Sequence, residues 1–152
     1  MVELVDGRVM LNARDIANKH FRLVATSNDG GETWTKLQQD PNLFEPPTSA
    51  SILRYTDPLD SDRNRILFAN PASSRDRIGM TIRLSYNEGH SWSVAKVINP
   101  SFSSYSCLTV LQDRTIGFAY ETGDTELYQH IRFVGFTLDW LKKGADTISH
   151  FD

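Results

Sequence analysis

The sequence of 152 residues predicts an all-β fold. Short segments rich in β-branched and aromatic residues recur along it, with turn residues between them. No long stretch keeps the 3.6-residue apolar period of an amphipathic helix. One eight-residue turn motif also occurs twice, which is typical of a fold built from repeated small sheets.

The strands are expected in a regular order along the chain. A hairpin is expected first, because Asp6-Gly7 tolerates the positive φ angles of a tight turn between Val2–Val5 and Arg8–Asn12. The later strands are expected at Arg22–Ser27, Ser51–Tyr55, Arg65–Phe68, Thr81–Ser85, Ser106–Leu111, Thr115–Tyr120 and His130–Thr137, with one helical turn at Asp139–Lys143. Gln38–Thr48 and Glu121–Gln129 are expected to be loops at the rim of a site. All six prolines are expected in loops, where a missing N–H costs no ladder bond: Pro41, Pro46, Pro47, Pro58, Pro71 and Pro100.

Composition excludes several classes of partner and cofactor. The 16 Lys and Arg and 19 Asp and Glu residues give a net charge of −3 and are mixed along the chain, so no nucleic acid is expected as a partner. The single cysteine, Cys107, cannot form an internal disulfide, and no Cys/His cluster has the spacing of metal ligands, so neither a metal nor a cofactor is expected. No apolar run approaches the roughly 20 residues that span a bilayer, and no leader is visible, which leaves the compartment open.

The repeated motif runs from Ser27 to Trp34 and again from Ser85 to Trp92, and its two copies begin 58 residues apart. In each copy an Asp or Asn side chain can accept N–H bonds within the turn, a glycine supplies left-handed backbone, and the Trp is expected to bury beneath the hairpin. Repeats of this length in an all-β sequence suggest propeller blades, which pack on one another because a small sheet cannot bury both faces alone. One domain over residues 1–152 is therefore expected.

Four segments resemble the sialidase family. The first turn matches Ser-x-Asp-x-Gly-x-Thr-Trp completely, and so resembles the Asp-box, or BNR repeat, of sialidases, although Asp-boxes also occur in other propellers. Further resemblance lies in residues 2–14, 70–85 and 105–121, in family order. The resemblance implies about half of a six-bladed antiparallel propeller.

The resemblance implies an active site for an acidic sugar. Arg14 and Arg77 match two arginines that bind the sialic acid carboxylate, for which a planar guanidinium fork is suited. Tyr105 matches the nucleophile, since a neutral phenol avoids the repulsion that a second carboxylate would meet. Glu121 matches a glutamate that orients one of the family's three arginines through a salt bridge. Two other arginines are weighed beside them: Arg75 could point the same way as Arg77, and Arg83 is expected to face outward from its strand.

Three groups of the family's site precede the matched segments: a third arginine, the aspartate acid/base and the glutamate that serves the tyrosine. Glu3 is expected to be structural and no substitute base, because its offset along an extended strand turns it to the other face. The expectation is the C-terminal part of an exo-α-sialidase, a retaining glycosidase acting on sialylated glycans, inactive or nearly so by itself. Such a piece is expected to associate with itself or with a missing first half. Two alternatives stay open: a non-catalytic sialic-acid or glycan-binding propeller piece, and an Asp-box scaffold for protein contacts.

Overall fold

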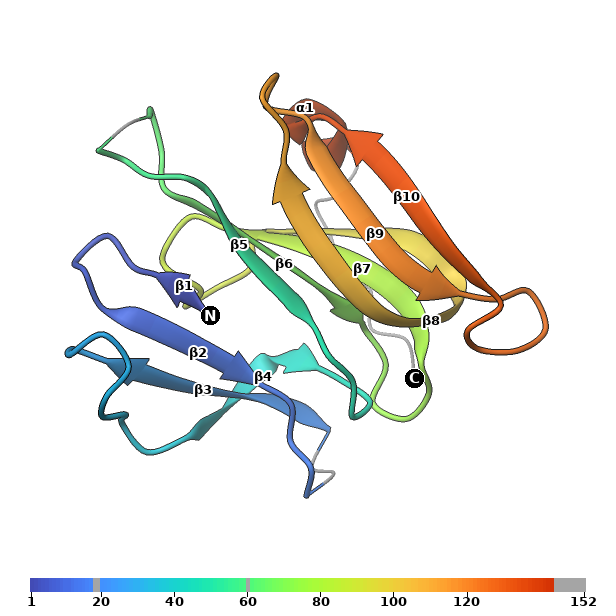
Figure 1. The fold of residues 1–152 in the computed structure, drawn as a ribbon, viewed down its shortest axis with the longest axis horizontal. Helices are drawn as coiled ribbons and strands as arrows, with labels where there is room; N and C mark the ends of the chain where they lie inside the picture. Colours follow the sequence, from blue (N-terminus) through green and yellow to red (C-terminus); the bar gives the residue numbers. More distant parts are fainter. Residues whose placement is uncertain (18–19, 60, 144–152) are drawn as a thin grey trace.

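The computed structural model describes residues 1–17, 20–59 and 61–143, and these residues form two antiparallel sheets (Figure 1). The first sheet has the strand order β1-β2-β3-β4, and the second has the order β10-β9-β8-β7-β6-β5. The elements are β1 (Val2–Glu3), β2 (Val9–Ala13), β3 (Phe21–Ser27), β4 (Gln38–Phe44), β5 (Ser51–Thr56), β6 (Arg65–Pro71), β7 (Ile78–Ser85), β8 (Val94–Val110), β9 (Ile116–Thr122), β10 (His130–Phe136) and α1 (Leu138–Lys142).

Strand β8 belongs to two small sheets at once. Its first part, up to Phe102, pairs with β7, and its second part, from Ser103, pairs with β9. The second sheet is therefore two antiparallel blades, β5–β8 and β8–β10, that share one long strand. Together with β1–β4 they make a series of three blades, coloured from blue to red in Figure 1. The prediction of all-β, antiparallel propeller blades is confirmed.

The middle blade is covered on both faces, and β6 shows how its sequence achieves this. Ile66 and Phe68 lie in one apolar cluster with residues of the first blade, whereas Leu67 and Ala69 lie in a second cluster with residues of the third blade. Alternate side chains of a strand point to opposite faces, so a continuous apolar run suits a strand with a sheet on each side. Burial of this kind is the main source of the fold's stability.

Most of the expected strands are present, but their limits differ and two regions were missed. Residues 38–44, expected to be part of a loop, form the edge strand β4 and contain Pro41, and the first part of β8 contains Pro100. Proline is tolerated at an edge or beside a bulge, and the register shifts between Phe21 and Arg22 and between Ile78 and Met80 mark such irregularities. Pro71 ends β6. The expectation that these three prolines lie in loops was wrong.

Arg83 does not face outward as expected. It is 2% exposed, and its Nη1 donates to Oδ1 of Asn70 at 2.7 Å, while Asn70 donates to the carbonyl of Phe44 in β4. The expectation failed because both faces of the middle blade are covered, so no side chain of β7 reaches solvent freely. Burial lowers the pKa of Arg83 to about 10. Arg83 thus links the first and second blades.

The two repeated turns have nearly the same hydrogen bonds. In the first, Ser27 Oγ donates to Asp29 Oδ1 at 2.6 Å, and Asp29 Oδ1 accepts the N–H of Thr33 at 2.9 Å. In the second, Asn87 Oδ1 accepts the corresponding bonds from Ser85 Oγ at 3.0 Å and from the N–H of Ser91 at 2.9 Å. An amide oxygen therefore replaces a carboxylate oxygen without change of geometry.

The two tryptophans of these turns differ in burial. Trp92 is 4% exposed, and its ring centre lies 5.4 Å from that of Phe68, within the cluster between the first and second blades. Trp34 is 36% exposed, and its Nε1 donates to the carbonyl of Gly31 in its own turn. The expectation of a buried Trp therefore holds for the second copy and is wrong for the first, because no described blade packs over Trp34.

Candidate active site

Arg77 is held by three separate segments of the chain. Its Nη2 donates to the carbonyl of Pro47 at 2.8 Å, and its Nη1 donates both to Ser104 Oγ at 3.2 Å and to the hydroxyl of Tyr128. Its own carbonyl accepts the N–H of Ser103 at 2.7 Å, which ties the loop before β7 to β8. The guanidinium is therefore fixed in place by contacts from both sides of the shared strand.

Tyr105 lies next to Arg77 at an irregular place in β8. The Cζ atom of Arg77 lies 5.5 Å from the centre of the Tyr105 ring. The pairing of β8 with β9 shifts register between Ser103 and Ser106, and there Ser103 and Ser104 are both fully buried while Tyr105 is 39% exposed. Such a bulge breaks the alternation of side chains and turns one of them towards solvent.

Glu121 contacts Tyr105 through the backbone. Its Oε2 accepts the N–H of Tyr105 at 3.2 Å, from the neighbouring strand β9. Within the described part of the chain the Glu121 carboxylate has no ion pair. The structure thus brings Arg77, Tyr105 and Glu121 together, although they lie up to 44 residues apart in the sequence.

Arg14 is exposed, directly after β2, and its guanidinium has no hydrogen bond to any residue that the structure describes. Its neighbour Asp15 is fixed, because the Asp15 N–H donates to Glu45 Oε1 at 3.0 Å. Glu45 also pairs with Arg22, and both side chains are at most 3% exposed. The backbone next to Arg14 is therefore held in place, while the Arg14 guanidinium has no hydrogen bond to a described residue.

A buried ion pair organises this region. Arg22 donates to the carbonyls of Thr48 and Asn12, both at 3.0 Å, besides its bond to Glu45. Burial lowers the pKa of Arg22 and raises that of Glu45, and their mutual attraction opposes both shifts. The segment 45–48 therefore contacts both candidate arginine regions. Glu45 binds the backbone of Asp15, next to Arg14, and the carbonyl of Pro47 binds Arg77.

Sequence reasoning missed the residues that position Arg77. The sequence singles out none of Pro47, Ser104 and Tyr128, although Pro47 and Tyr128 lie in the two segments expected at the rim of the site, Gln38–Thr48 and Glu121–Gln129. A weak signal was present in Glu45-Pro46-Pro47, because two consecutive prolines stiffen a segment. Arg75, the alternative to Arg77, is exposed, and its side chain makes no hydrogen bond or ion pair with the described residues.

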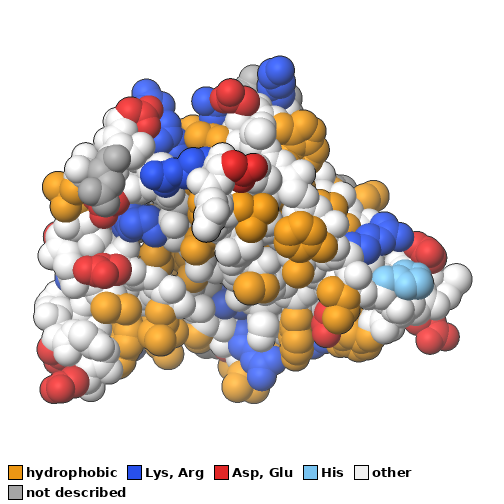
Figure 2. All heavy atoms as spheres, turned by 45° about the horizontal axis from the view of Figure 1, so that its top comes forward, with side chains coloured by type: hydrophobic (Ala, Val, Ile, Leu, Met, Phe, Trp, Pro, Cys, Tyr) orange, Lys and Arg blue, Asp and Glu red, His pale blue; other side chains and the backbone are white. Residues whose placement is uncertain are grey.

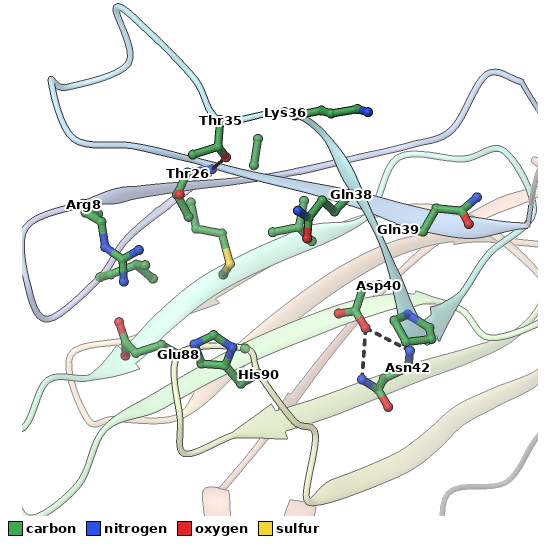
Figure 3. A pocket seen from close by; sticks show the side chains of 16 residues that line it. Arg8, Thr26, Thr35, Lys36, Gln38, Gln39, Asp40, Asn42, Glu88 and His90 are labelled. Atoms are coloured by element: carbon green, nitrogen blue, oxygen red, sulfur yellow. Dashed lines mark hydrogen bonds between the residues drawn. The ribbon is translucent and has the colours of Figure 1, made fainter.

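The larger hollows lie elsewhere. A groove of about 450 Å³ with a mixed polar and apolar lining separates the outer strands of the first blade from the second turn, where Glu88 and His90 face Gln38 and Asp40 (Figure 3). Another, of about 540 Å³, is lined by Ile98, Phe136 and Trp140, among others. The candidate site itself has only a smaller, shallow hollow of about 230 Å³, which Tyr105 and Glu121 help to line. Figure 2 shows hydrophobic side chains in the middle of one face, with charged side chains around them.

Residues 1–17, 20–59 and 61–143 contain neither a cluster of metal ligands nor a membrane-spanning helix. No three His, Cys, Asp or Glu side chains there come together as metal ligands would. None of the helices in those ranges is long and apolar enough to cross a membrane.

Known proteins resemble this chain in sequence. The family model of the BNR repeat-like domain matches residues 1–119. The sialidase of Micromonospora viridifaciens is 45% identical over 143 residues, which are 92% of this chain and 21% of that protein. The exo-alpha-sialidase of Aspergillus fumigatus is 30% identical over 161 residues, covering 96% of this chain and 38% of that protein. The chain therefore spans about a fifth to two-fifths of these relatives.

Solved structures resemble it in fold. The Hadza microbial sialidase Hz136 superposes with a TM-score of 0.77 at 31% identity, over 89% of this chain and 26% of that chain. The intramolecular trans-sialidase of Ruminococcus gnavus, in complex with oseltamivir carboxylate, superposes with a TM-score of 0.78 at 25% identity, over 92% of this chain and 32% of that chain. The family model covers well over half of the chain, and the sequence and structural relatives agree with it. The chain therefore belongs to the BNR repeat-like domain family, and within it resembles sialidases in sequence and in fold.

Proposed function

We propose that this chain supplies part of the active site of an exo-α-sialidase, which removes terminal sialic acids from glycans. The observation that carries the proposal is the cluster of Arg77, Tyr105 and Glu121, formed from three elements around a half-exposed phenol. A guanidinium with free N–H groups beside an accessible phenol is the arrangement that cleavage of a carboxylated sugar requires. The sialidase relatives support the same assignment.

In the proposed mechanism, Arg77 and Arg14 bind the carboxylate on the anomeric carbon. The phenol oxygen of Tyr105 attacks that carbon and forms a covalent glycosyl-enzyme, and the aglycone leaves with a proton. Water then replaces the tyrosine, so the configuration is retained. The base for the phenol, the general acid and a third arginine would come from outside these 152 residues, and Glu121 would pair with that arginine.

The test is release of a fluorescent aglycone from a sialoside by the protein in its natural length. Tyr105→Phe should abolish turnover, whereas Tyr55→Phe, which removes a hydroxyl bonded to the Arg114 carbonyl, should not. Turnover that survives Tyr105→Phe would overturn the proposal. Binding of sialic acid without turnover, lost on Arg14→Ala, would indicate a glycan-binding module, and neither activity would leave a scaffold for protein contacts.

We also propose that another propeller sheet packs on each end of the series. At one end Trp34 is far more exposed than its counterpart Trp92, and at the other Ile131 and Phe133 are 80% and 62% exposed. Exposed apolar side chains of this size favour association. Sedimentation of the chain alone tests self-association, and addition of the remaining blades tests pairing with them.

Replacement of Phe133 by Lys should weaken either association, and Leu59→Lys, at a still more exposed loop position, should not. A chain that stays monomeric and also fails to bind the remaining blades would contradict the proposal.

A further inference from the structure

The backbone of Tyr128 has an unusual conformation for its residue type. Its φ angle is 67°, in the left-handed region that residues with a large side chain avoid. Such a conformation persists only where the surrounding structure imposes it, and it is enriched at functional sites. Tyr128 is also 55% exposed, so burial of its ring does not explain the conformation.

The loop between β9 and β10 imposes this conformation. Oε1 of Gln129 accepts the N–H groups of Asp124, Thr125 and Glu126, at 2.8, 3.2 and 3.4 Å. The Gln129 amide also donates to Thr125 Oγ1 at 2.8 Å. A side chain at Gly123 would begin 1.5 Å from the carbonyl oxygen of Glu126, so the loop folds back tightly on itself. The loop is therefore closed from within, and it holds Tyr128 at its end.

The hydroxyl of Tyr128 reaches across to Arg77 and accepts a hydrogen bond from Nη1. Ser104 and Pro47 accept two more, from Nη1 and Nη2. A guanidinium has five N–H bonds in a fixed plane, so the Nε–H and one Nη2–H of Arg77 have no acceptor among the described residues. These two nitrogens lie on one edge of the plane, which is the geometry of a bidentate bond to a carboxylate.

We propose that Tyr128 is a positioning residue that fixes the guanidinium plane of Arg77 and so presents its Nε edge to a carboxylate ligand. The inference rests on the proposed function in that Arg77 binds the sialic acid carboxylate. It goes further by assigning a role to a loop tyrosine, whose contact lies 51 residues away in the sequence.

Two measurements on the protein in its natural length test the role, with Tyr128→Phe as the variant. The first is the NMR signal of the Arg77 Nε–H group, assigned by its loss in Arg77→Lys. Loss of the hydroxyl should free the guanidinium, so the signal of Tyr128→Phe should broaden or average. Tyr55→Phe is the matched control, because it also removes one tyrosine hydroxyl bond, to the Arg114 carbonyl.

The second measurement is the affinity for N-acetylneuraminic acid and for its methyl ester. Tyr128→Phe should weaken binding of the acid roughly five- to tenfold and leave binding of the ester unchanged, because only the acid offers a charged carboxylate to Arg77. A merely structural role for Tyr128 would change both affinities equally.

The outcomes separate the two proposals. If the wild-type protein in its natural length binds neither compound, the assignment of Arg77 to a sialic acid carboxylate fails, while the Arg77 signal still tests the positioning. If Tyr128→Phe keeps both the Arg77 signal and the affinity for the acid, or weakens acid and ester alike, the positioning role of Tyr128 is overturned.

Discussion

The guanidinium of Arg77 lies over the ring of Tyr105, with Cζ 5.5 Å from the ring centre. Arg77 lies in the loop before β7, and Tyr105 lies at the bulge of β8. The contact therefore connects that loop to the strand that the second and third blades share. A guanidinium over an aromatic face is attracted by the ring's electrons, by about 0.5–1 kcal/mol at an exposed site. The ring therefore supports Arg77 independently of its hydroxyl group.

From this contact we expect the two functions of Tyr105 to be separable. Tyr105→Phe keeps the ring under Arg77, so binding of N-acetylneuraminic acid should stay at the wild-type level. Tyr105→Ala removes the ring, and the affinity should fall by about two- to fivefold. Calorimetric titration of both variants checks this, and equal affinities for the two would contradict it.

Arg77 should not be replaceable by lysine. Arg77→Lys keeps the charge but loses the planar fork and the three hydrogen bonds to Pro47, Ser104 and Tyr128. Binding of N-acetylneuraminic acid should weaken at least about tenfold. Arg75→Ala is the control, since Arg75 is an exposed neighbour, and an equal loss in both variants would show a general effect of surface charge.

Removal of one partner of the buried Arg22–Glu45 pair should destabilise the fold strongly. Glu45→Ala leaves the Arg22 charge buried without its partner, and the free energy of unfolding should fall by about 3–5 kcal/mol at pH 7. The double variant Arg22→Met, Glu45→Leu should lose less, because it removes both charges. Urea unfolding measures this, and a double variant less stable than Glu45→Ala would be the contrary result.

The two tryptophans of the repeated turns offer a matched comparison of burial. Trp92→Ala removes a side chain packed on Phe68 between two blades and should destabilise the chain by about 3–5 kcal/mol. Trp34→Ala removes a side chain that is one-third exposed, so its effect should be clearly smaller. Thermal or urea unfolding of the two variants measures these changes. Equal losses of stability in Trp92→Ala and Trp34→Ala would refute the prediction.

The carboxylate of Asp29 should make part of the stability depend on pH. Hydrogen bonds from Ser27 and then Thr33 hold the pKa of Asp29 well below its ordinary value of about 4. Because the pKa of Asp29 is lower in the folded state than in the unfolded state, its ionised carboxylate stabilises the fold. This stabilisation is present above the ordinary pKa and is lost as the pH falls towards the pKa of the folded state.

Asp29→Asn should remove this part of the acid dependence and keep the turn, because Asn87 makes the equivalent bonds in the second copy. Thermal melts between pH 2 and pH 7 compare the variant with the wild type. If the melting temperatures of the two proteins fall in parallel as the pH is lowered, Asp29 does not contribute to the pH dependence of stability.

Some features of this protein are determined by the sequence alone. The repeated turns can be predicted because their hydrogen bonds join residues at most four positions apart, and such bonds form in any fold that contains the segment. The all-β class is predictable because β-branched and aromatic runs between turn residues leave no helical period. The resemblance of residues 2–14, 70–85 and 105–121 to the sialidase family singles out Arg14, Arg77, Tyr105 and Glu121 as candidates, although it does not give the distances between them.

Only the tertiary structure decided which side chains are buried and which positions support the site. Arg83 is an ordinary strand residue in sequence, and it is buried because a blade lies on each face of β7. Trp34 and Trp92 occupy the same motif position, yet only one has a blade packed over it. Pro47, Ser104 and Tyr128 meet at Arg77 from loops and a bulge far apart in the chain. Local sequence determines local hydrogen bonds, whereas burial and long-range contacts depend on how whole sheets pack against one another.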